Sequence, residues 1–154
     1  MLDRNYVMGG KAVFTVVRQD GGHYTYKVKG VVFSKDEAAR KQLVKERKFD
    51  QFLVYLLTGP DNESSYTYMG RLDVKTGNVV ETQKTPASYR SKAGVMSRPF
   101  AVANWALAQM WNKNEKFAFR IMHNGHCSVC GRTLTEPESI ELGIGPICAE
   151  KVYG

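Results

Sequence analysis

The chain has 154 residues, 43% of them apolar and 24% charged, which fits a globular protein with one core and a small appendage. It contains no run of about 18 apolar residues, and its first residues lack the apolar segment of a signal peptide, so we expect a cytoplasmic protein without a membrane span. The formal net charge of +7 favours either an acidic partner or simply a soluble surface.

The first two predicted elements form a β-hairpin. Residues 11–17 and 24–32 are rich in β-branched and aromatic side chains, which are typical of strands. Between them lies Gln19-Asp20-Gly21-Gly22, a run of residues that favours a tight turn.

A helix and a buried strand are predicted next. Ser34 with Glu37 three residues later matches a capping box, and few apolar residues follow, so residues 34–48 should form a short, largely exposed helix. Residues 51–58 are almost all apolar and are closed by Gly59-Pro60, which predicts a central strand buried on both faces.

Two more strands and a loop follow in the sequence. Residues 66–74 alternate in polarity, and Lys75-Thr76-Gly77-Asn78 turns the chain into a further strand at residues 79–82. Residues 83–98 contain four basic residues, no acidic residue and many small side chains, which is typical of a mobile loop.

A second helix and a last strand complete the part upstream of the cysteines. Pro99 suits the first turn of a helix. The helix that begins there has one apolar face, made of Phe100, Ala103, Leu107, Met110 and Trp111. Residues 117–122 alternate again and predict a strand that leads directly to the cysteines.

These elements predict an α+β fold, with an antiparallel sheet of five or six strands, two helices and a small C-terminal zinc knuckle. We expect a basic α+β domain over residues 1–122 and a zinc-binding module over residues 123–154. A module of about 30 residues buries too little apolar surface to fold alone, so a metal ion is expected to organise it.

All three cysteines lie in the predicted module. Cys127 and Cys130 form a C-x2-C pair, and Gly131 after them permits the tight turn that directs two thiolates at one ion. Cys148 comes two residues after Pro146, which can begin a helical turn whose backbone N–H groups favour a thiolate. Three thiolates predict a structural Zn²⁺ site that needs one further ligand.

Two histidines compete for the fourth position. His126 is bonded directly to Cys127, and adjacent side chains in an extended segment point to opposite faces, which makes joint ligation awkward. His123 precedes Cys127 by four residues, and Asn124-Gly125 can turn the chain back, so we favour His123. The predicted metal ligands are His123, Cys127, Cys130 and Cys148.

Two other interpretations of the cysteines remain open. They can be free, partly buried thiols that coincide in sequence, or the C-x2-C pair can be a redox motif. A redox pair normally follows a strand and begins a helix, whereas Gly131-Arg132-Thr133-Leu134 suggests a return strand.

The cysteine segment also resembles a known signature. The runs CSVCGRTLT, PESI and GIGP, followed by Cys148, are similar to those of an uncharacterised family of small zinc-module proteins found in bacteriophages and prophages. GGKAVFTVV and LLTGPDNESSYTYMGRL resemble the N-terminal half of phage members. The resemblance implies a zinc site and a phage origin, but no activity. A treble-clef finger would offer another cysteine three residues after Cys148, where this chain has Lys151.

The basic surplus lies entirely upstream of the cysteines. Residues 1–60 contain eleven Lys/Arg and six Asp/Glu, residues 61–122 nine and five, and residues 123–154 two and four. In a nucleic-acid complex, cations neutralise phosphates and tyrosine rings stack on unpaired bases. The predicted contacts in the acid-free loop are Lys84, Tyr89, Arg90, Lys92 and Arg98. Further candidates on the first predicted helix are Arg40, Lys41, Lys45, Arg47 and Lys48.

Paired tyrosines on the predicted strands have two interpretations. Tyr24 and Tyr26, and likewise Tyr66 and Tyr68, are two residues apart, so each pair shares one face of the sheet. Such pairs more often pack in a core or across strands than serve as platforms for bases.

We therefore expect a phage-encoded, zinc-containing accessory protein that binds DNA or RNA, single-stranded or structured, through its first 122 residues. The alternative is a module that binds or inhibits a host protein, and a third possibility is a virion component. The sequence has neither an arguable Ser/His/Asp arrangement nor a phosphate-cradling glycine motif, so we expect no enzyme and no small-molecule substrate.

Overall fold

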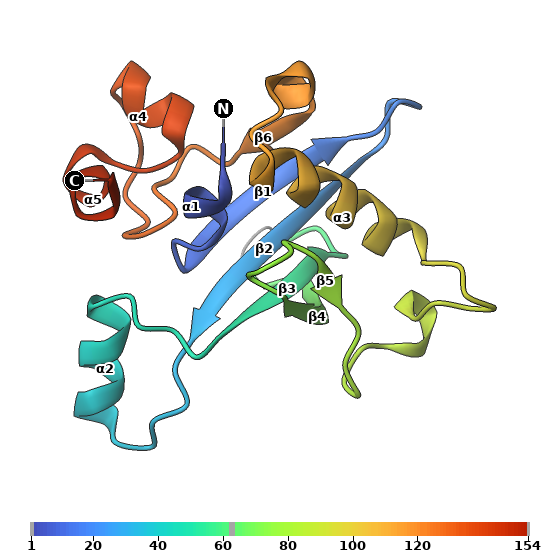
Figure 1. Cartoon of the computed structure of the whole chain (residues 1–154), viewed down its shortest axis with the longest axis horizontal. Coiled ribbons are helices and arrows are strands. Elements are labelled where there is room, and N and C mark those ends of the chain that lie inside the picture. Colours follow the sequence, from blue (N-terminus) through green and yellow to red (C-terminus); the bar gives the residue numbers. More distant parts are fainter. Residues whose placement is uncertain (1, 62–63, 154) are drawn as a thin grey trace.

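The computed structural model describes residues 2–61 and 64–153, and its architecture is α+β (Figure 1). Its strands are β1 (Lys11–Val17), β2 (His23–Val31), β3 (Gln51–Leu57), β4 (Tyr66–Leu72), β5 (Val79–Val80) and β6 (Ile121–His123). In this part of the chain they form one six-stranded antiparallel sheet in the order β5-β4-β3-β2-β1-β6. The predicted fold class is confirmed, while the outer ends of the predicted domains, residues 1 and 154, lie outside the described residues.

The helices are α1 (Arg4–Val7), α2 (Glu37–Lys45), α3 (Arg98–Trp111), α4 (Pro137–Leu142) and α5 (Pro146–Tyr153), with 3-10 helices η1 (Ala87–Tyr89) and η2 (Glu115–Arg120). The two helices predicted from the sequence are α2 and α3, and α5 begins at the proline that was expected to start a helical turn. Helices α1 and α4 have four and six residues, too few to show a helical period in the sequence. None of the described helices combines the length and the hydropathy needed to cross a membrane.

The hairpin of β1 and β2 confirms the strand pattern read from the sequence. Phe14 pairs with Tyr26 on the buried face. Thr15 pairs with Thr25 on the opposite face, where their hydroxyl oxygens lie 2.7 Å apart. The register therefore assigns every side chain of the hairpin to one of two faces.

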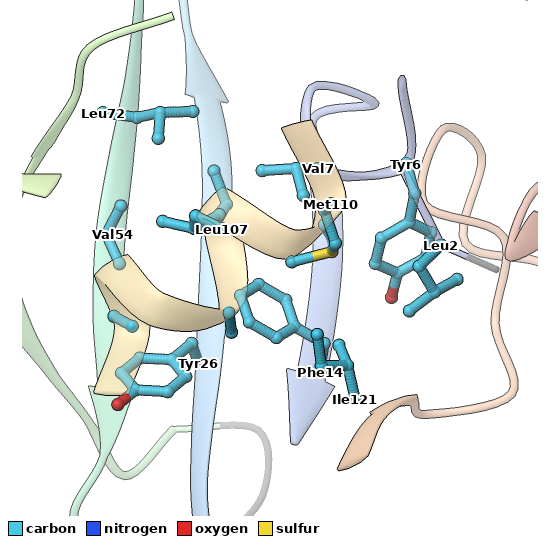
Figure 2. Close-up of a cluster of buried hydrophobic side chains, with 14 of the residues drawn as sticks. Leu2, Tyr6, Val7, Phe14, Tyr26, Val54, Leu72, Leu107, Met110 and Ile121 are labelled. Carbon is cyan, nitrogen blue, oxygen red and sulfur yellow. The ribbon is translucent and has the colours of Figure 1, made fainter. Parts of the chain in front are cut away.

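One face of the sheet is covered by α3, which packs on β1, β2 and β5 (Figures 1 and 2). The residues that this helix buries are Phe100, Ala103, Ala106, Leu107 and Met110. Tyr26 lies beneath the start of α3 and donates its hydroxyl hydrogen to Pro99 O at 2.7 Å. The predicted apolar face of the helix is thus the one that packs, although Trp111 is only partly buried.

Strand β3 was predicted to be buried on both faces, and this prediction was wrong. Val54 and Leu56, on the covered face, are 1% and 4% exposed. Leu53, Tyr55 and Leu57, on the other face, are only partly buried. The reason is that α3 packs on one side alone, so neighbours on adjacent strands provide most of the shielding on the other. We call the surface that carries these three residues the open face of the sheet.

The strand predicted at residues 117–122 was also wrong for most of its length. Up to residue 120 this segment is the 3-10 helix η2, because the side-chain oxygen of Asn114 accepts a hydrogen bond from Lys116 N–H at 3.2 Å and caps a helical turn. Only β6 remains extended, and it pairs with β1 through His123 and Phe14.

Helix α2 is largely exposed and buries no residue, as predicted, but its N-terminal cap differs from the prediction. Asp36, and not Ser34, occupies the cap position, and its carboxylate accepts a hydrogen bond from Ala38 N–H at 3.2 Å. Asp36 lies two residues closer to the helix than Ser34, and its carboxylate pairs with one of the unpaired N–H groups at the start of the helix that Ser34 was expected to cap.

The N-terminal segment packs against the end of the chain (Figure 2). Tyr6 is fully buried, and its hydroxyl donates to Val13 O at 2.6 Å. Its ring lies 6.0 Å from that of His123, and so close to Gly143 that a β-carbon there would overlap it. The predicted domain boundary after residue 122 falls within β6, and side chains from both sides of it share one core.

We expect Leu107→Ala to lower the free energy of unfolding by about 2–5 kcal/mol, because Leu107 is fully buried and its removal leaves a cavity under α3. Urea denaturation followed by circular dichroism measures the change. The control is Val95→Ala, whose side chain is 69% exposed and whose loss should change stability by less than about 0.5 kcal/mol. Equal effects of the two substitutions would contradict the packing described above.

Candidate metal centre and adjoining basic pocket

Cys127 and Cys130 lie in a tight turn between β6 and α4. Cys127 O accepts a hydrogen bond from Gly131 N–H at 2.9 Å. Gly131 has a φ of +82°, which glycine adopts without the strain that a β-carbon would cause. After the turn the chain returns antiparallel, with a β-bridge between His126 and Thr133. The glycine and the return segment therefore act as predicted.

Helix α5 brings the third thiol to this turn. Cys148 is the third residue of α5, which begins at Pro146. The sulfur atoms of the three cysteines lie within 4.8 Å of one another, and none of the three is in a disulfide. In a tetrahedral site with metal–sulfur bonds of about 2.3 Å the sulfur atoms stand about 3.8 Å apart. Only small side-chain movements separate the present arrangement from a site that holds a metal ion.

Two of the thiols differ strongly in acidity. Burial raises the pKa of Cys127, but hydrogen bonds from the backbone N–H groups of Cys130, Gly145 and Val129 outweigh burial and lower this pKa to about 7. Burial, and then the neighbouring Cys130 and Cys127 side chains, raise the pKa of Cys148 to about 12. A thiolate is thus available near neutral pH at Cys127, whereas Cys148 must lose a proton when a metal binds.

Within the described residues, neither candidate histidine belongs to the thiol cluster. His123 uses both ring nitrogens elsewhere: Nδ1 accepts a hydrogen bond from Gly125 N–H at 2.9 Å, and Nε2 lies 2.5 Å from Ile140 O. His126 is exposed. Ligation by His123 remains a prediction, and these contacts do not favour it.

The geometry also bears on the other interpretations of the cysteines. The C-x2-C pair lies in a turn and not at the start of a helix, which disfavours the redox motif. Cys148 is 18 residues beyond Cys130 in sequence and still meets it in space. This convergence is the arrangement that ligation of one metal ion requires.

A cavity of about 590 Å³ adjoins the cysteine cluster, and we call it the basic pocket. Cys130 and Cys148 line one side of it. Phe49 lines another and packs on Gly10 and Gly30, where a β-carbon on either glycine would lie 2.7 Å from its ring. Its basic side chains come from β1, β2, α2 with the turn that follows it, and α5: Lys11, Lys27, Lys29, Lys45, Arg47 and Lys151. Among the described residues that line the pocket, none is acidic.

No described acidic side chain forms an ion pair with these six cations. The ion pairs of the described residues lie elsewhere, at Arg18 with Asp20, Lys41 with Glu37, and Lys48 with Glu46. Six like charges around one cavity repel one another, so an anion that enters the pocket relieves this repulsion. The pocket is therefore suited to a phosphate or another polyanionic group.

The structure does not bring the predicted nucleic-acid contacts into one cluster. Lys84 lines a groove on the open face, whereas Arg98 lines a separate cavity beside Arg18 and Arg120. Lys92 is exposed in a turn closed by its own backbone hydrogen bonds with Val95. These residues therefore point to no single contact surface.

Hydrogen bonds and packing hold the loop of residues 83–98 in place at several points. The Arg90 guanidinium donates to Thr85 O at 3.0 Å and to Thr82 O at 2.5 Å. Tyr89 packs partly against the core, and its carbonyl accepts a hydrogen bond from Ser97 Oγ at 2.7 Å. Arg90 and Tyr89 thus have contacts within the protein that hold the loop in place.

Sequence reasoning missed the lysines of β1 and β2 and Lys151. A signal was present in β2, where Tyr26 and Val28 alternate with Lys27 and Lys29, so both lysines had to share the face opposite the core. Nothing in the sequence could place Lys151 beside them, because α5 reaches this position only through the fold.

Residues 121–153 match a protein family described as a family of unknown function (DUF6011). The matched region contains β6, all three cysteines, α4 and α5. It supports the resemblance of the cysteine segment to an uncharacterised family and does not reach the basic residues of β1, β2 and α2. Neither curated proteins nor solved structures give a match to the chain.

We expect Cys148→Ser to abolish stoichiometric metal binding and His123→Ala to retain it, because the thiols converge while the histidine bonds elsewhere. Elemental analysis of protein purified under reducing conditions measures metal per chain, and circular dichroism confirms that each variant is folded. Loss of metal from His123→Ala would instead establish this histidine as the fourth ligand.

Metal affinity should fall as the pH falls. Metal binding displaces the proton of Cys148, whose pKa is about 12, and below neutral pH also that of Cys127, whose pKa is about 7. We expect the apparent affinity to decrease at least about tenfold from pH 8 to pH 7, and more steeply below. Competition with a chelator, corrected for the chelator's own protonation, measures this. A constant affinity over the range would exclude ligation by these thiolates.

Proposed function

We propose that this protein is a zinc-containing nucleic-acid-binding protein. The observation that carries the proposal is the basic pocket, where six Lys/Arg side chains, with no carboxylate among the described lining residues, surround one cavity. Lys and Arg neutralise phosphates and release bound counterions, which is the main source of affinity for nucleic acids. A pocket of this charge therefore fits a phosphate backbone.

The distribution of charge favours a polymer over a small anion. Lys27 belongs to the basic pocket and also stands on the open face, between β1 and β3. Farther across the same face, Arg71 and Lys84 line a second hollow. Cations spread from β1 to β4 suit a ligand with several phosphates, whereas a single small anion would use only one of the two sites.

Zinc is the ion that the thiol cluster supports best. Three thiolates are soft ligands, and a tetrahedral site of sulfur and nitrogen donors is typical of structural Zn²⁺. Bound there, the ion would join the Cys127 turn to α5. This turn and this helix also supply Cys130, Cys148 and Lys151 to the pocket, so the metal would hold one wall of the proposed binding surface.

A role in binding a host protein is the second candidate. It is favoured by exposed apolar side chains on the C-terminal helices, where Ile140, Ile147 and Tyr153 are 45%, 63% and 46% exposed. Such side chains occur at protein interfaces. The phage origin that the resemblance implies would be tested by the genes that neighbour this one.

We expect the double variant Lys29→Glu/Lys45→Glu to bind single-stranded and duplex oligonucleotides at least about tenfold more weakly than the unchanged protein, because both lysines line the basic pocket. The control is Lys75→Glu, an exposed lysine in the turn after β4 that lines neither hollow. Fluorescence anisotropy measures affinity across a salt series.

The salt series separates the two candidate functions. Affinity of the unchanged protein should fall steeply as salt rises, and the slope should become shallower by about 0.7 for each single-strand phosphate contact that a variant loses. If affinity is indifferent to salt and to both substitutions, nucleic-acid binding is wrong. Capture of a host protein that survives nuclease treatment would then support the second candidate.

A further inference from the structure

Aromatic side chains gather on the open face next to the cations. Tyr55 of β3 lies between Lys27 of β2 and Tyr68 of β4 in the pairing register, and Leu57 pairs with Tyr66. All three tyrosines are only partly buried. They are therefore neither core residues nor scattered surface residues, but one cluster on the uncovered side of the sheet.

The rings of this cluster are held in defined positions. Tyr55 and Tyr68 meet edge to face, with ring centroids 5.8 Å apart. The Tyr68 hydroxyl lies 3.0 Å from Thr82 Oγ1. The Lys27 ammonium stands 4.7 Å from the centre of the Tyr66 ring and 5.5 Å from that of Tyr55. Contacts of this kind fix the rings while leaving part of each exposed to solvent.

The rings of Tyr55 and Tyr68 border a groove of about 660 Å³, which we call the aromatic groove. Phe33 lies at the groove with 61% of its surface exposed, although its backbone is anchored by a hydrogen bond of 2.7 Å from its N–H to the Asp50 carboxylate. The charged residues among its described lining are Arg71 and Lys84, both basic. An exposed phenylalanine beside half-buried tyrosines and unopposed cations suits a ligand that is both flat and anionic.

We propose that the aromatic groove stacks the unpaired bases of a single-stranded nucleic acid whose phosphates continue into the basic pocket. The inference rests on the proposed function and adds to it the class of ligand and the residues that select it. Bases stack on the rings of Phe33, Tyr55 and Tyr68, while Arg71 and Lys84 neutralise the adjoining phosphates. Lys27 connects the two hollows, because it lines the basic pocket and contacts the tyrosine rings.

Single strands are favoured over the other polyanions by the chemistry of the groove. A duplex keeps the faces of its bases stacked on one another, so it offers phosphates to the cations but no ring to the tyrosines. An acidic peptide supplies carboxylates and again no extended planar group. Of these three ligands, only an unpaired strand satisfies the aromatic and the basic side chains together.

The test compares two classes of variant on two probes. The probes are a fluorescein-labelled oligothymidylate of about 12 nucleotides and a duplex of the same length. Both probes are long enough to span a single small binding surface. Tyr55→Leu/Tyr68→Leu removes the rings, and Tyr55→Phe/Tyr68→Phe keeps them. Phe119→Leu is the matched control, since Phe119 is 75% exposed on η2 and lines neither hollow.

We expect the leucine double variant to bind the single strand at least about tenfold more weakly, as the loss of one stacked base predicts. Its affinity for the duplex should change less than about twofold. The phenylalanine double variant and Phe119→Leu should bind both probes as the unchanged protein does. Circular dichroism checks that the leucine variant is folded.

The remaining outcomes decide between this inference and the function on which it rests. If the leucine variant keeps its affinity for the single strand while Lys29→Glu/Lys45→Glu loses it, base stacking is wrong and nucleic-acid binding stands. Equal losses on strand and duplex also overturn stacking, because they point to a structural role of the tyrosines. If the unchanged protein binds neither probe, both proposals fail.

Discussion

The covering of the sheet by α3 on one side only is the constraint on which the rest of the structure depends. Because side chains alternate along a strand, burying Tyr26 and Val28 of β2 beneath α3 forces Lys27 and Lys29 onto the opposite face. The same register places the tyrosines of β3 and β4 beside these lysines. The packing that builds the core therefore also sorts cations and aromatic rings onto one solvent-facing surface.

The cysteine module packs into the same core as the rest of the chain, although its short length suggested that only a metal would order it. Its buried Ile144 and Leu134 belong to the same core as Leu2 and Tyr6 of the N-terminal segment. A backbone hydrogen bond of 2.7 Å from Lys11 N–H to Ser128 O adds a polar link to the module. Contacts with the rest of the chain therefore help to order the module, whereas its length alone suggested that a metal must do so unaided.

Much of the fold follows from local patterns, and the site follows only in part. Alternation in β1, β2 and β4, the apolar face of α3 and the turn at Gly131 are properties of a few neighbouring residues, so the sequence predicts them. The 3-10 helix before β6 depends on the Asn114 cap, which overrides an alternating pattern. The convergence of the three thiols could be predicted from their spacing. The basic pocket could not, because its lysines come from segments that only the tertiary fold brings together.

The contacts of the N-terminal segment with residues that follow β6 limit the order in which parts of the molecule can fold. Tyr153 donates its hydroxyl hydrogen to the Asp3 carboxylate at 3.1 Å across a separation of 150 residues. Leu2 and Tyr6 bury their side chains among residues that follow β6. During translation the segment with Leu2 and Tyr6 therefore leaves the ribosome long before the residues on which it packs. Its apolar side chains remain exposed to water, or bound by a chaperone, until those residues have also been made. Completion of the native state therefore depends on residues made about 150 positions later in the chain.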